Sequence, residues 1–324
     1  MLGKLLFPLS AGLASGLLFL SPTLISVAGV VLVYLAPLPI AITGFAHGLT
    51  AATITAAISA LSVGFVLISS ATLPGLYTVL LITIYAPVLL IICLALKQPN
   101  QSNGTASWYP VGNILSWLTC LALGIFLLAA AIMTATDAGF RGSIERVLFT
   151  SIGILAGQTQ EFDPTITARL KEIVPMIAKT VPSTMINTWM IILPILNCVL
   201  AHRMVSAHGK SIRPRPRYRE LNVSNWLLLG VGSGALLTIL NGELEFLGLN
   251  LLLIASIPYF FIGLAVLHSI SAAWPGRPIL LTGIYITLVL AHWPAVILVA
   301  AGVLEHWLRL RDRMKSTLTQ KGDD

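Results

Sequence analysis

The sequence predicts an all-α fold: a polytopic membrane helix bundle with about ten membrane segments (eight to ten) and both termini inside. The first observation is that Leu5–Leu96, a stretch of 92 residues, contains no Asp, Glu, Lys or Arg. As a helix it would extend about 138 Å, enough to cross a hydrocarbon core of about 30 Å roughly four times. The second is that only 10% of the 324 residues are charged, against about 25% in soluble domains. The third is a mean hydropathy of +0.91, which is typical of an integral membrane protein.

The positions of the charges exclude a nucleic-acid-binding protein, although the net charge is +7. The cations cluster at 213–219 and 309–315, each beside an apolar segment, and form no separate basic face. The three cysteines, Cys93, Cys120 and Cys198, are widely spaced within apolar segments and match no metal or redox motif. We therefore expect buried apolar thiols, no metal and no cofactor.

The first two segments are separated by proline-containing breaks. Leu5–Leu20 is expected to be a retained first helix, because further apolar segments follow at once and no small-residue cleavage site is evident. It contains Gly12 and Gly16, a GxxxG spacing that lets another helix approach closely. The second segment, Thr23–Ala36, is expected to end at Pro37-Leu38-Pro39, since proline removes a backbone donor and restricts the residue before it.

The third segment, Gly44–Ser70, is dominated by Gly, Ala, Ser and Thr. Small side chains allow close backbone contact, which predicts either a central packed helix or a docking face for another helix. The candidate docking residues are Ala52, Ala56 and Ala60. The fourth segment is Leu76–Leu96, and a short polar loop follows it.

Residues 137–181, after a fifth segment at Trp108–Ala135, are expected to form an extracytoplasmic amphipathic insert. Asp163-Pro164 has the form of an N-cap followed by proline at the first helical position. Apolar residues then recur at helical spacing as far as Ile177. We expect this helix to be bent or split at Pro175, and to lie at the membrane surface or cap the bundle.

The distribution of cations predicts the topology of the remaining chain. After a sixth segment, Pro182–Ala201, residues 202–222 form a basic loop in which arginine alternates with proline, and 309–324 form a basic tail. If both are cytoplasmic, an even number of crossings lies between them. Segments 223–241 and 247–273 supply two, so Ile279–Leu308 must supply two more as short helices broken at His292-Trp293-Pro294. The alternative for Ile279–Leu308 is one tilted helix.

Several short motifs resemble the YybS-like bacterial inner-membrane proteins, a family of unknown function. They are Ala36-Pro37-Leu38-Pro39, Ala46-His47-Gly48, Pro182 with Asn187, the basic loop, Asn250 with Gly263-Leu264-Ala265, and the tail Gly302–Arg311. That family is distantly similar to the substrate-binding S components of energy-coupling-factor transporters and to the rod-shape protein MreD. In an S component, a small-residue face such as Ala52/Ala56/Ala60 would dock a coupling subunit. This chain is longer than an S component, and its insert departs from that pattern.

Candidate ligand-binding residues lie at the segment ends. Glu243 and Glu245 lie at the outer end of 223–241 and 247–273, and His292 lies at the outer turn of the last hairpin. If these ends meet, two carboxylates and an imidazole can bind a cation, a proton or a polar ligand. The alternative is a short solvated loop and an interfacial histidine. His47, the only histidine in Leu5–Leu96, is either a proton-sensitive switch or is hydrogen-bonded to a carbonyl freed by the proline break.

The basic loop and a glycine-rich run are two further candidate sites. Arg213, Arg215, Arg217 and Arg219 are expected to set the topology and to attract anionic lipids or a partner. Gly230–Gly234 lacks the strand–turn–helix context of a phosphate loop. If Ser233 were a nucleophile with His268 as its base, the two residues would differ by roughly 7 Å in membrane depth, which is beyond hydrogen-bond reach. We therefore expect Gly230–Gly234 to form a packing face, and we expect no catalytic residue.

These observations predict a multi-pass protein of the bacterial inner membrane that is not an enzyme. The leading hypothesis is a small-molecule binding or transport component that associates with an ATPase or coupling module. The alternative is a non-transport scaffold that holds envelope proteins, and a remote alternative is an intramembrane hydrolase. Anionic lipids are expected partners in either of the first two cases.

Overall fold

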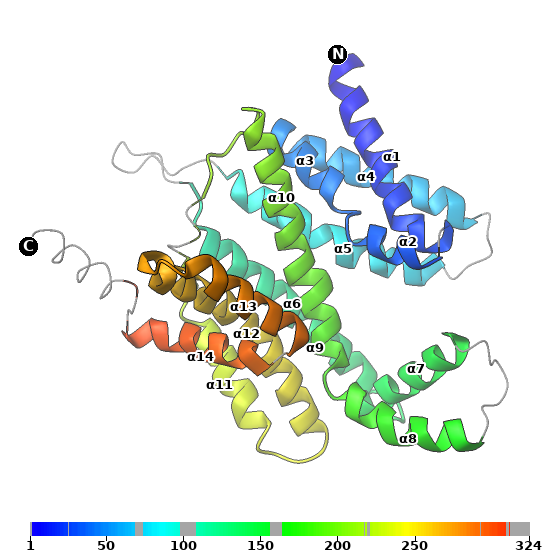
Figure 1. The fold of residues 1–324 in the computed structure, drawn as a ribbon. Coiled ribbons are helices and arrows are strands. Elements are labelled where there is room, and N and C mark those ends of the chain that lie inside the picture. Colours follow the sequence, from blue (N-terminus) through cyan, green and yellow to red (C-terminus); the bar gives the residue numbers. More distant parts are fainter. Residues whose placement is uncertain are drawn as a thin grey trace, which may run out of the picture. The chain divides into compact units, whose positions relative to one another are not determined.

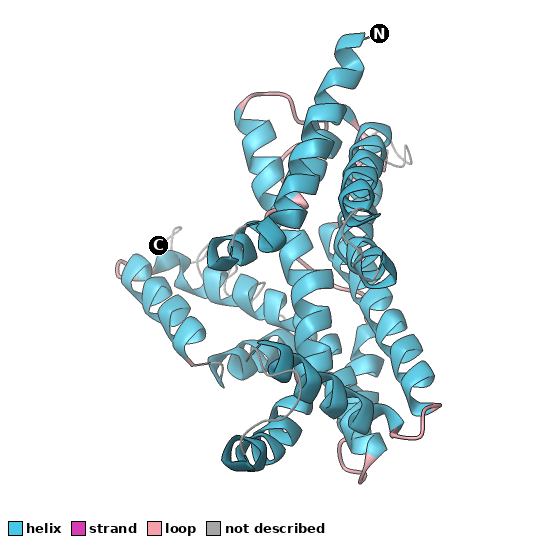
Figure 2. Ribbon diagram, turned by 90° about the vertical axis from the view of Figure 1, so that its right-hand side faces the viewer, coloured by secondary structure: helices cyan, strands magenta, loops and turns pink. Residues whose placement is uncertain are grey.

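The computed structural model describes residues 2–24, 26–68, 74–97, 108–155, 164–216, 218, 221–291, 293–308 and 311. Within these ranges every regular element is a helix (Figure 2). The chain divides into two compact units. Unit 1 comprises Met1–Leu118 and Asn187–Pro216, and unit 2 comprises Thr119–Ile186 and Arg217–Asp324.

Unit 1 contains the charge-free N-terminal stretch, the start of the helix after it and a later helical segment (Figure 1). Its helices are α1 (Leu2–Leu24), α2 (Ser26–Val33), α3 (Leu38–His47), α4 (Leu49–Ile68), α5 (Pro74–Ala95), the start of α6 (Val111–Thr134), the π-helical turn η1 (Asn187–Ile192) and α10 (Leu193–Ala207). The first helix is longer than expected and continues to Leu24 with Pro22 inside it.

Helix α4 packs closely against α1 within unit 1. A methyl group at Gly12 would lie 2.7 Å from Cβ of Ile58 on α4, and one at Gly16 would overlap Oγ of Ser62. The glycine spacing in α1 therefore accommodates a helix of the same chain. Ala52 and Ala56 are 0% and 7% exposed, so this stripe of α4 lies in the unit's core, as the packed-helix alternative requires.

The proline break is a four-residue interruption within one candidate span and does not end a segment. The apolar helical stretch Ala28–His47 is long enough to cross a bilayer and includes both α2 and α3. The carbonyls exposed by the break are bonded by other helices: Ser15 Oγ donates to Ala36 O at 2.7 Å, and Asn197 Nδ2 donates to Tyr34 O at 3.0 Å. Unwound backbone is tolerated inside a membrane protein when its polar groups are satisfied in this way.

Unit 2 is built around the long helix α12 (Glu243–Ile270) (Figure 1). The other elements are the rest of α6, α7 (Gly139–Leu155), α8 (Pro164–Ala178), α9 (Val181–Ile186), α11 (Leu227–Leu237), the 3₁₀ turn η3 (Ser271–Ala273), α13 (Arg277–Leu290) and α14 (Trp293–Leu308). Helices α11 and α14 both pack on α12.

Glycines permit these two contacts. Methyl groups at Gly263 and Gly302 would overlap the carbonyl oxygens of Leu298 and Tyr259, respectively, so α12 and α14 cross with their backbones almost touching. Seven residues before Tyr259 on α12, the backbone of Leu252 faces Gly234 of α11. Such crossings are typical of membrane helices, in which small residues mark the interfaces.

Seven helical stretches in the described residues are long and apolar enough to cross a membrane. An eighth is present if α13 and α14, whose axes differ by 118°, together form one broken span or a re-entrant loop. Ile279–Leu308 thus contains two helices, as predicted, but they have only 14 and 16 residues. The predicted crossing at 223–241 corresponds to α11, whose 11 residues are shorter than the usual span of about 20.

Several predicted boundaries need correction. The sixth segment is one apolar stretch, Val181–Ala207, that includes η1, so His202 lies in helix α10 and not in the basic loop. The helix predicted from Pro164 is present as α8, but it continues through Pro175. Helix α7 was not predicted, because its apolar residues are interrupted by glycine and charge. His47 ends α3, and Gly48, whose φ of 93° suits glycine, separates it from α4.

Candidate functional site

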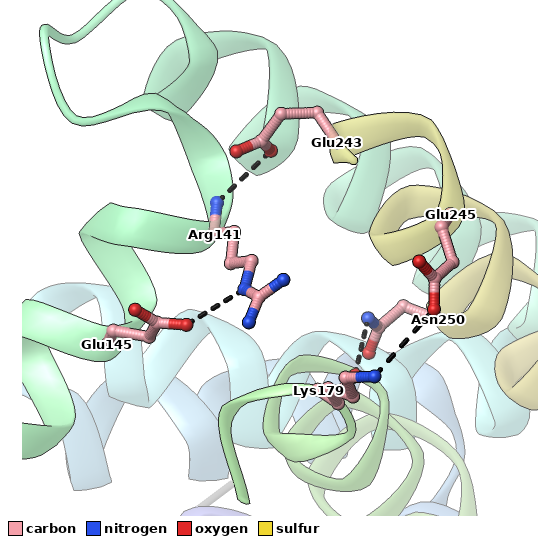
Figure 3. A network of polar contacts seen from close by, with 6 residues as sticks. All are labelled: Arg141, Glu145, Lys179, Glu243, Glu245 and Asn250. Atoms are coloured by element: carbon pink, nitrogen blue, oxygen red, sulfur yellow. Dashed lines mark hydrogen bonds and ion pairs between the residues drawn. The ribbon is translucent and has the colours of Figure 1, made fainter. Parts of the chain in front are cut away.

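The predicted acidic pair lies in the first turn of α12, where it contacts the insert within unit 2 (Figure 3). A carboxylate oxygen of Glu243 accepts a hydrogen bond from the backbone N–H of Arg141 at 3.2 Å. Arg141 in turn donates through Nε to Glu145 at 2.8 Å. Glu243 thus binds the start of α7, and its negative charge also suits the N-terminal end of α12.

Glu245 and Asn250 connect α12 with the turn between α8 and α9 (Figure 3). The Nζ of Lys179 lies 3.7 Å from a Glu245 oxygen, and both side chains are more than 40% exposed, so this ion pair contributes little stability. Asn250 is fully buried: its Oδ1 accepts from Ser183 N at 2.9 Å, and its Nδ2 donates to Lys179 O and Phe246 O, both at 2.9 Å. The buried amide is the stronger of the two links.

An aromatic contact supports the same junction. The ring of Phe140 on α7 lies edge-on to Phe126 of α6 at 5.8 Å and to Phe246 of α12 at 5.1 Å. Phe126, Phe140 and Phe246 are all almost fully buried. The residues around Glu243 and Glu245 therefore join structural elements, and ligand binding by this pair stays a prediction.

The two histidines of the predicted sites are not shown together with these acids. His292 lies outside the described residues. His47 is exposed and its ring packs edge-on against Phe7 at 4.9 Å within unit 1. The carbonyl oxygens freed by the proline break accept hydrogen bonds from Ser15 and Asn197, whereas a hydrogen bond from His47 was the expected one.

Arg213 of the basic loop is buried, with 6% of its surface exposed. Its Nη1 donates to Ala95 O at the end of α5 at 3.2 Å, and its Nη2 donates to Tyr109 O at 2.8 Å. The guanidinium also lies 5.9 Å from the ring centre of Trp108. The cation therefore caps a helix C-terminus inside unit 1, where it compensates the partial negative charge of the carbonyls.

The other arginines of this loop differ in position. The carbonyl oxygen of Arg213 is within 3.0 Å of His202 Nε2, which further fixes the loop on α10. Arg215 is exposed, and Arg217 and Arg219 lie outside the described residues. Of the described arginines in this loop, Arg215 is thus the one placed to meet lipid headgroups, and that contact stays a prediction.

A cavity of about 430 Å³ lies within unit 2, toward the other end of α12 from the acidic pair. Its lining comes from the loop before α11, from α12, from α14 and from the residue Arg311. The lining residues are Asn222, Val223, Asn225, Tyr259, Ile262, Gly302, Glu305, His306 and Arg311. Tyr259 is sixteen residues from Glu243 along α12, a distance of about 24 Å.

A buried ion pair forms one wall of this cavity. Arg311 Nε lies 2.7 Å from Glu305 Oε1, and the two side chains are only 14% and 7% exposed. Arg311 Nη1 also donates to Leu221 O at 2.9 Å, which connects the end of α14 with the loop before α11. Charges removed from water in this way are costly unless they are paired and hydrogen-bonded.

Tyr259 adds a polar group to the same cavity. The residue is 1% exposed, and its hydroxyl has no hydrogen-bond partner among the described residues. A buried hydroxyl without a partner costs about 1–3 kcal/mol, so Tyr259 brings to the lining a hydrogen-bonding group that the described residues leave unused.

Sequence reasoning did not assign this site, although Glu305 offered a signal. It is the only carboxylate in the apolar run Ile279–Leu308, and an ionisable residue in such a run is a functional candidate by default.

The residues considered for catalysis have separate partners. Ser233 Oγ donates to Gly230 O at 3.2 Å, one turn earlier in α11. His268 Nε2 lies 2.8 Å from the hydroxyl of Tyr285 on α13. In the part of the chain that the structure describes, no group of three or more His, Cys, Asp or Glu side chains is placed to hold a metal ion.

The apolar helices, their glycine crossings and the buried polar links define a polytopic helical membrane protein. The chain belongs to the family described as "Predicted membrane protein (DUF2232)", whose model matches residues 13–303. No curated protein and no solved structure matches the chain. The resemblance to YybS-like proteins, S components and MreD stays a prediction.

Proposed function

We propose that this protein binds a small polar molecule in the bacterial inner membrane, as a component of a transport system. The observation that carries the proposal is the cavity of about 430 Å³ in unit 2. Its volume lies within the range of about 300–1,000 Å³ that is usual for small-molecule sites. Its lining is mainly polar, with Val223, Ile262 and Gly302 as the apolar part, so the polar groups of a small ligand can find partners there.

The buried ion pair supports this proposal. Glu305 and Arg311 lie beside a cavity, and ionisable groups within apolar segments are usually retained for function. A purely structural pair is the simpler alternative, because Arg311 also bonds Leu221 O and so fixes the end of α14. Only the first alternative predicts that a ligand binds in the cavity beside the ion pair.

The test is native mass spectrometry of the full chain, purified gently in detergent and released from micelles in the spectrometer. A small metabolite bound in stoichiometric amount supports the proposal. A chain that is always empty, and that no vitamin or other metabolite screened stabilises against heat, contradicts it. If the protein is a transport component, crosslinking in cells should also recover an ATPase module.

A second candidate function is a scaffold for envelope proteins, and the arrangement of the insert favours it. Helices α7 and α8 are held on α12 through Asn250 and Glu243, while Met176 of α8 is 72% exposed and Lys171 is exposed. A fixed surface with apolar and basic groups can bind a membrane surface or another protein. In this case crosslinking should recover envelope proteins and no ATPase.

The proposed orientation places both termini and the basic loop in the cytoplasm, and the insert outside. Two exposed residues, Arg215 and Lys171, report on it when each is changed to cysteine in a variant without the three native cysteines. A membrane-impermeant thiol reagent added to intact cells should label the cysteine at 171 and not the one at 215. Labelling of both, or only of the cysteine at 215, contradicts the orientation.

The proposal includes no enzymatic activity. It is supported by the separate bonding of Ser233 and His268, which leaves the serine without a base in this conformation. Ser233→Ala is therefore expected to leave ligand binding unchanged and to abolish no hydrolysis.

A further inference from the structure

We infer that the cavity of unit 2 selects a small ligand without net charge, either an uncharged polar molecule or a zwitterion. This inference rests on the proposed function, because it names the chemical class of the ligand at the same site. The polar groups that define the class come from Tyr259, Glu305, Arg311 and two asparagines.

The balance of charge in the lining is the first argument. Among the described lining residues there is one carboxylate, Glu305, and one guanidinium, Arg311, separated by 2.7 Å, and His306 is the remaining basic group, which carries no charge in the formal count at pH 7. Both are largely removed from water. A ligand with a net charge would leave one charge unbalanced beside a pair that is largely removed from water, whereas a neutral ligand preserves the pairing. A zwitterion offers a carboxylate to Arg311 and an ammonium group to Glu305, so it too preserves the balance.

The hydrogen-bonding capacity of the lining is the second argument. The Tyr259 hydroxyl can donate or accept, and it has no partner among the described residues. Asn222 and Asn225 are exposed at the mouth, and each amide offers both donors and an acceptor. Sites that mix donors and acceptors in this way match hydroxyl, amide or amino-acid groups, and an apolar ligand would leave Tyr259 unsatisfied.

The size of the cavity limits the ligand. A volume of about 430 Å³ is near the lower end of the range for small-molecule sites. Gly302 contributes to this space, and its close approach to the Tyr259 backbone leaves no room for a side chain there. The expected ligand is therefore a compact metabolite with several polar groups.

The experiment measures thermal stabilisation and Kd of the full chain in detergent with four compact probes of different charge. The probes are serine as the zwitterion, myo-inositol as the neutral compound, glycerol phosphate as the anion and choline as the cation. For the wild type we expect serine or myo-inositol to bind more tightly than either charged probe. Glu305→Gln removes the negative member of the pair, so glycerol phosphate should then bind on the order of tenfold more tightly than it binds the wild type.

Tyr259→Phe is the second variant, because it keeps both charges and removes one oxygen atom. It should weaken the preferred probe about tenfold, as expected for a lost hydrogen bond, and leave the order of the four probes unchanged. This variant keeps the inference testable if Glu305→Gln does not fold.

The outcomes separate the inference from the proposed function. A wild type that prefers glycerol phosphate or choline overturns the inference and leaves a small-molecule site in place. Unchanged probe affinities in both variants also overturn it, since the ligand then binds elsewhere. If no probe binds and native mass spectrometry finds the chain empty, the proposed function fails and the inference fails with it.

Discussion

Arg213→Ala is expected to destabilise unit 1, because it removes a buried cation that two carbonyls require. The guanidinium donates at 3.2 Å to Ala95 O and at 2.8 Å to Tyr109 O. A hydrogen bond to a charged group contributes about 1.5–3 kcal/mol, and a buried acceptor left without its donor costs a similar amount. If the 3.2 Å bond is counted as an ordinary one of about 0.5–1.5 kcal/mol and the 2.8 Å bond at about 1.5–3 kcal/mol, the expected loss is about 2–5 kcal/mol.

The assay combines thermal unfolding in mild detergent with limited proteolysis. Cleavage by trypsin after the exposed Lys210 should become faster when the loop leaves unit 1, so the change in cleavage rate between variants reports local opening. A loss of about 2–5 kcal/mol corresponds to an increase of roughly 30-fold or more in the open population. Arg213→Lys should fall between the wild type and Arg213→Ala, because it keeps the charge and loses the planar fork.

Arg215→Ala is the matched control, since Arg215 lies in the same loop and is exposed. It should change stability by no more than about 0.5 kcal/mol. If Arg213→Ala and Arg215→Ala show the same melting temperature and the same cleavage rate, the burial of Arg213 does not hold the loop and the reasoning is refuted.

Two further substitutions test the packing of unit 2. Asn250→Ala removes the amide that bonds Ser183 N and two carbonyls, and should lower the free energy of unfolding in detergent by about 2–4 kcal/mol. Asn241 is exposed, so Asn241→Ala should be close to neutral. Equal effects of the two substitutions would exclude Asn250 as the link. Gly302→Ala would overlap the Tyr259 carbonyl oxygen and should lower the melting temperature, whereas Gly283→Ala has no atom within 4 Å and should be neutral or slightly stabilising; a tolerated Gly302→Ala would show that α12 and α14 do not cross as described.

The apolar helices could be predicted because their signal is local. Leu5–Leu96 lacks charge, and the structure has the candidate spans of α1, α2–α3, α4 and α5 there. The predicted boundaries failed at Pro37-Leu38-Pro39 and at His202. In both places a polar or helix-breaking residue was taken as the end of a segment, but its polar groups are satisfied by other helices or by the loop, so the apolar segment continues.

The candidate site was harder to predict, because polar residues alone do not reveal what surrounds them. Glu243 and Glu245 were read as ligand groups, whereas the structure places them at a junction with α7 and Lys179. Glu305 and Arg311 were quoted only as part of a tail motif. Arg311 contacts both Glu305 and the carbonyl oxygen of Leu221, 90 residues earlier in the chain, which no spacing in the sequence specifies.

The sequence by itself determined that this chain is a helical membrane protein, since transfer of apolar side chains into hydrocarbon depends on composition and adds along each segment. Only the tertiary structure decided that Arg213 is buried, that α12 is the centre of unit 2 and that a polar cavity lies beside Tyr259. The physical reason is that a polar group's role depends on the partners it meets after folding, and these come from segments far apart in the chain.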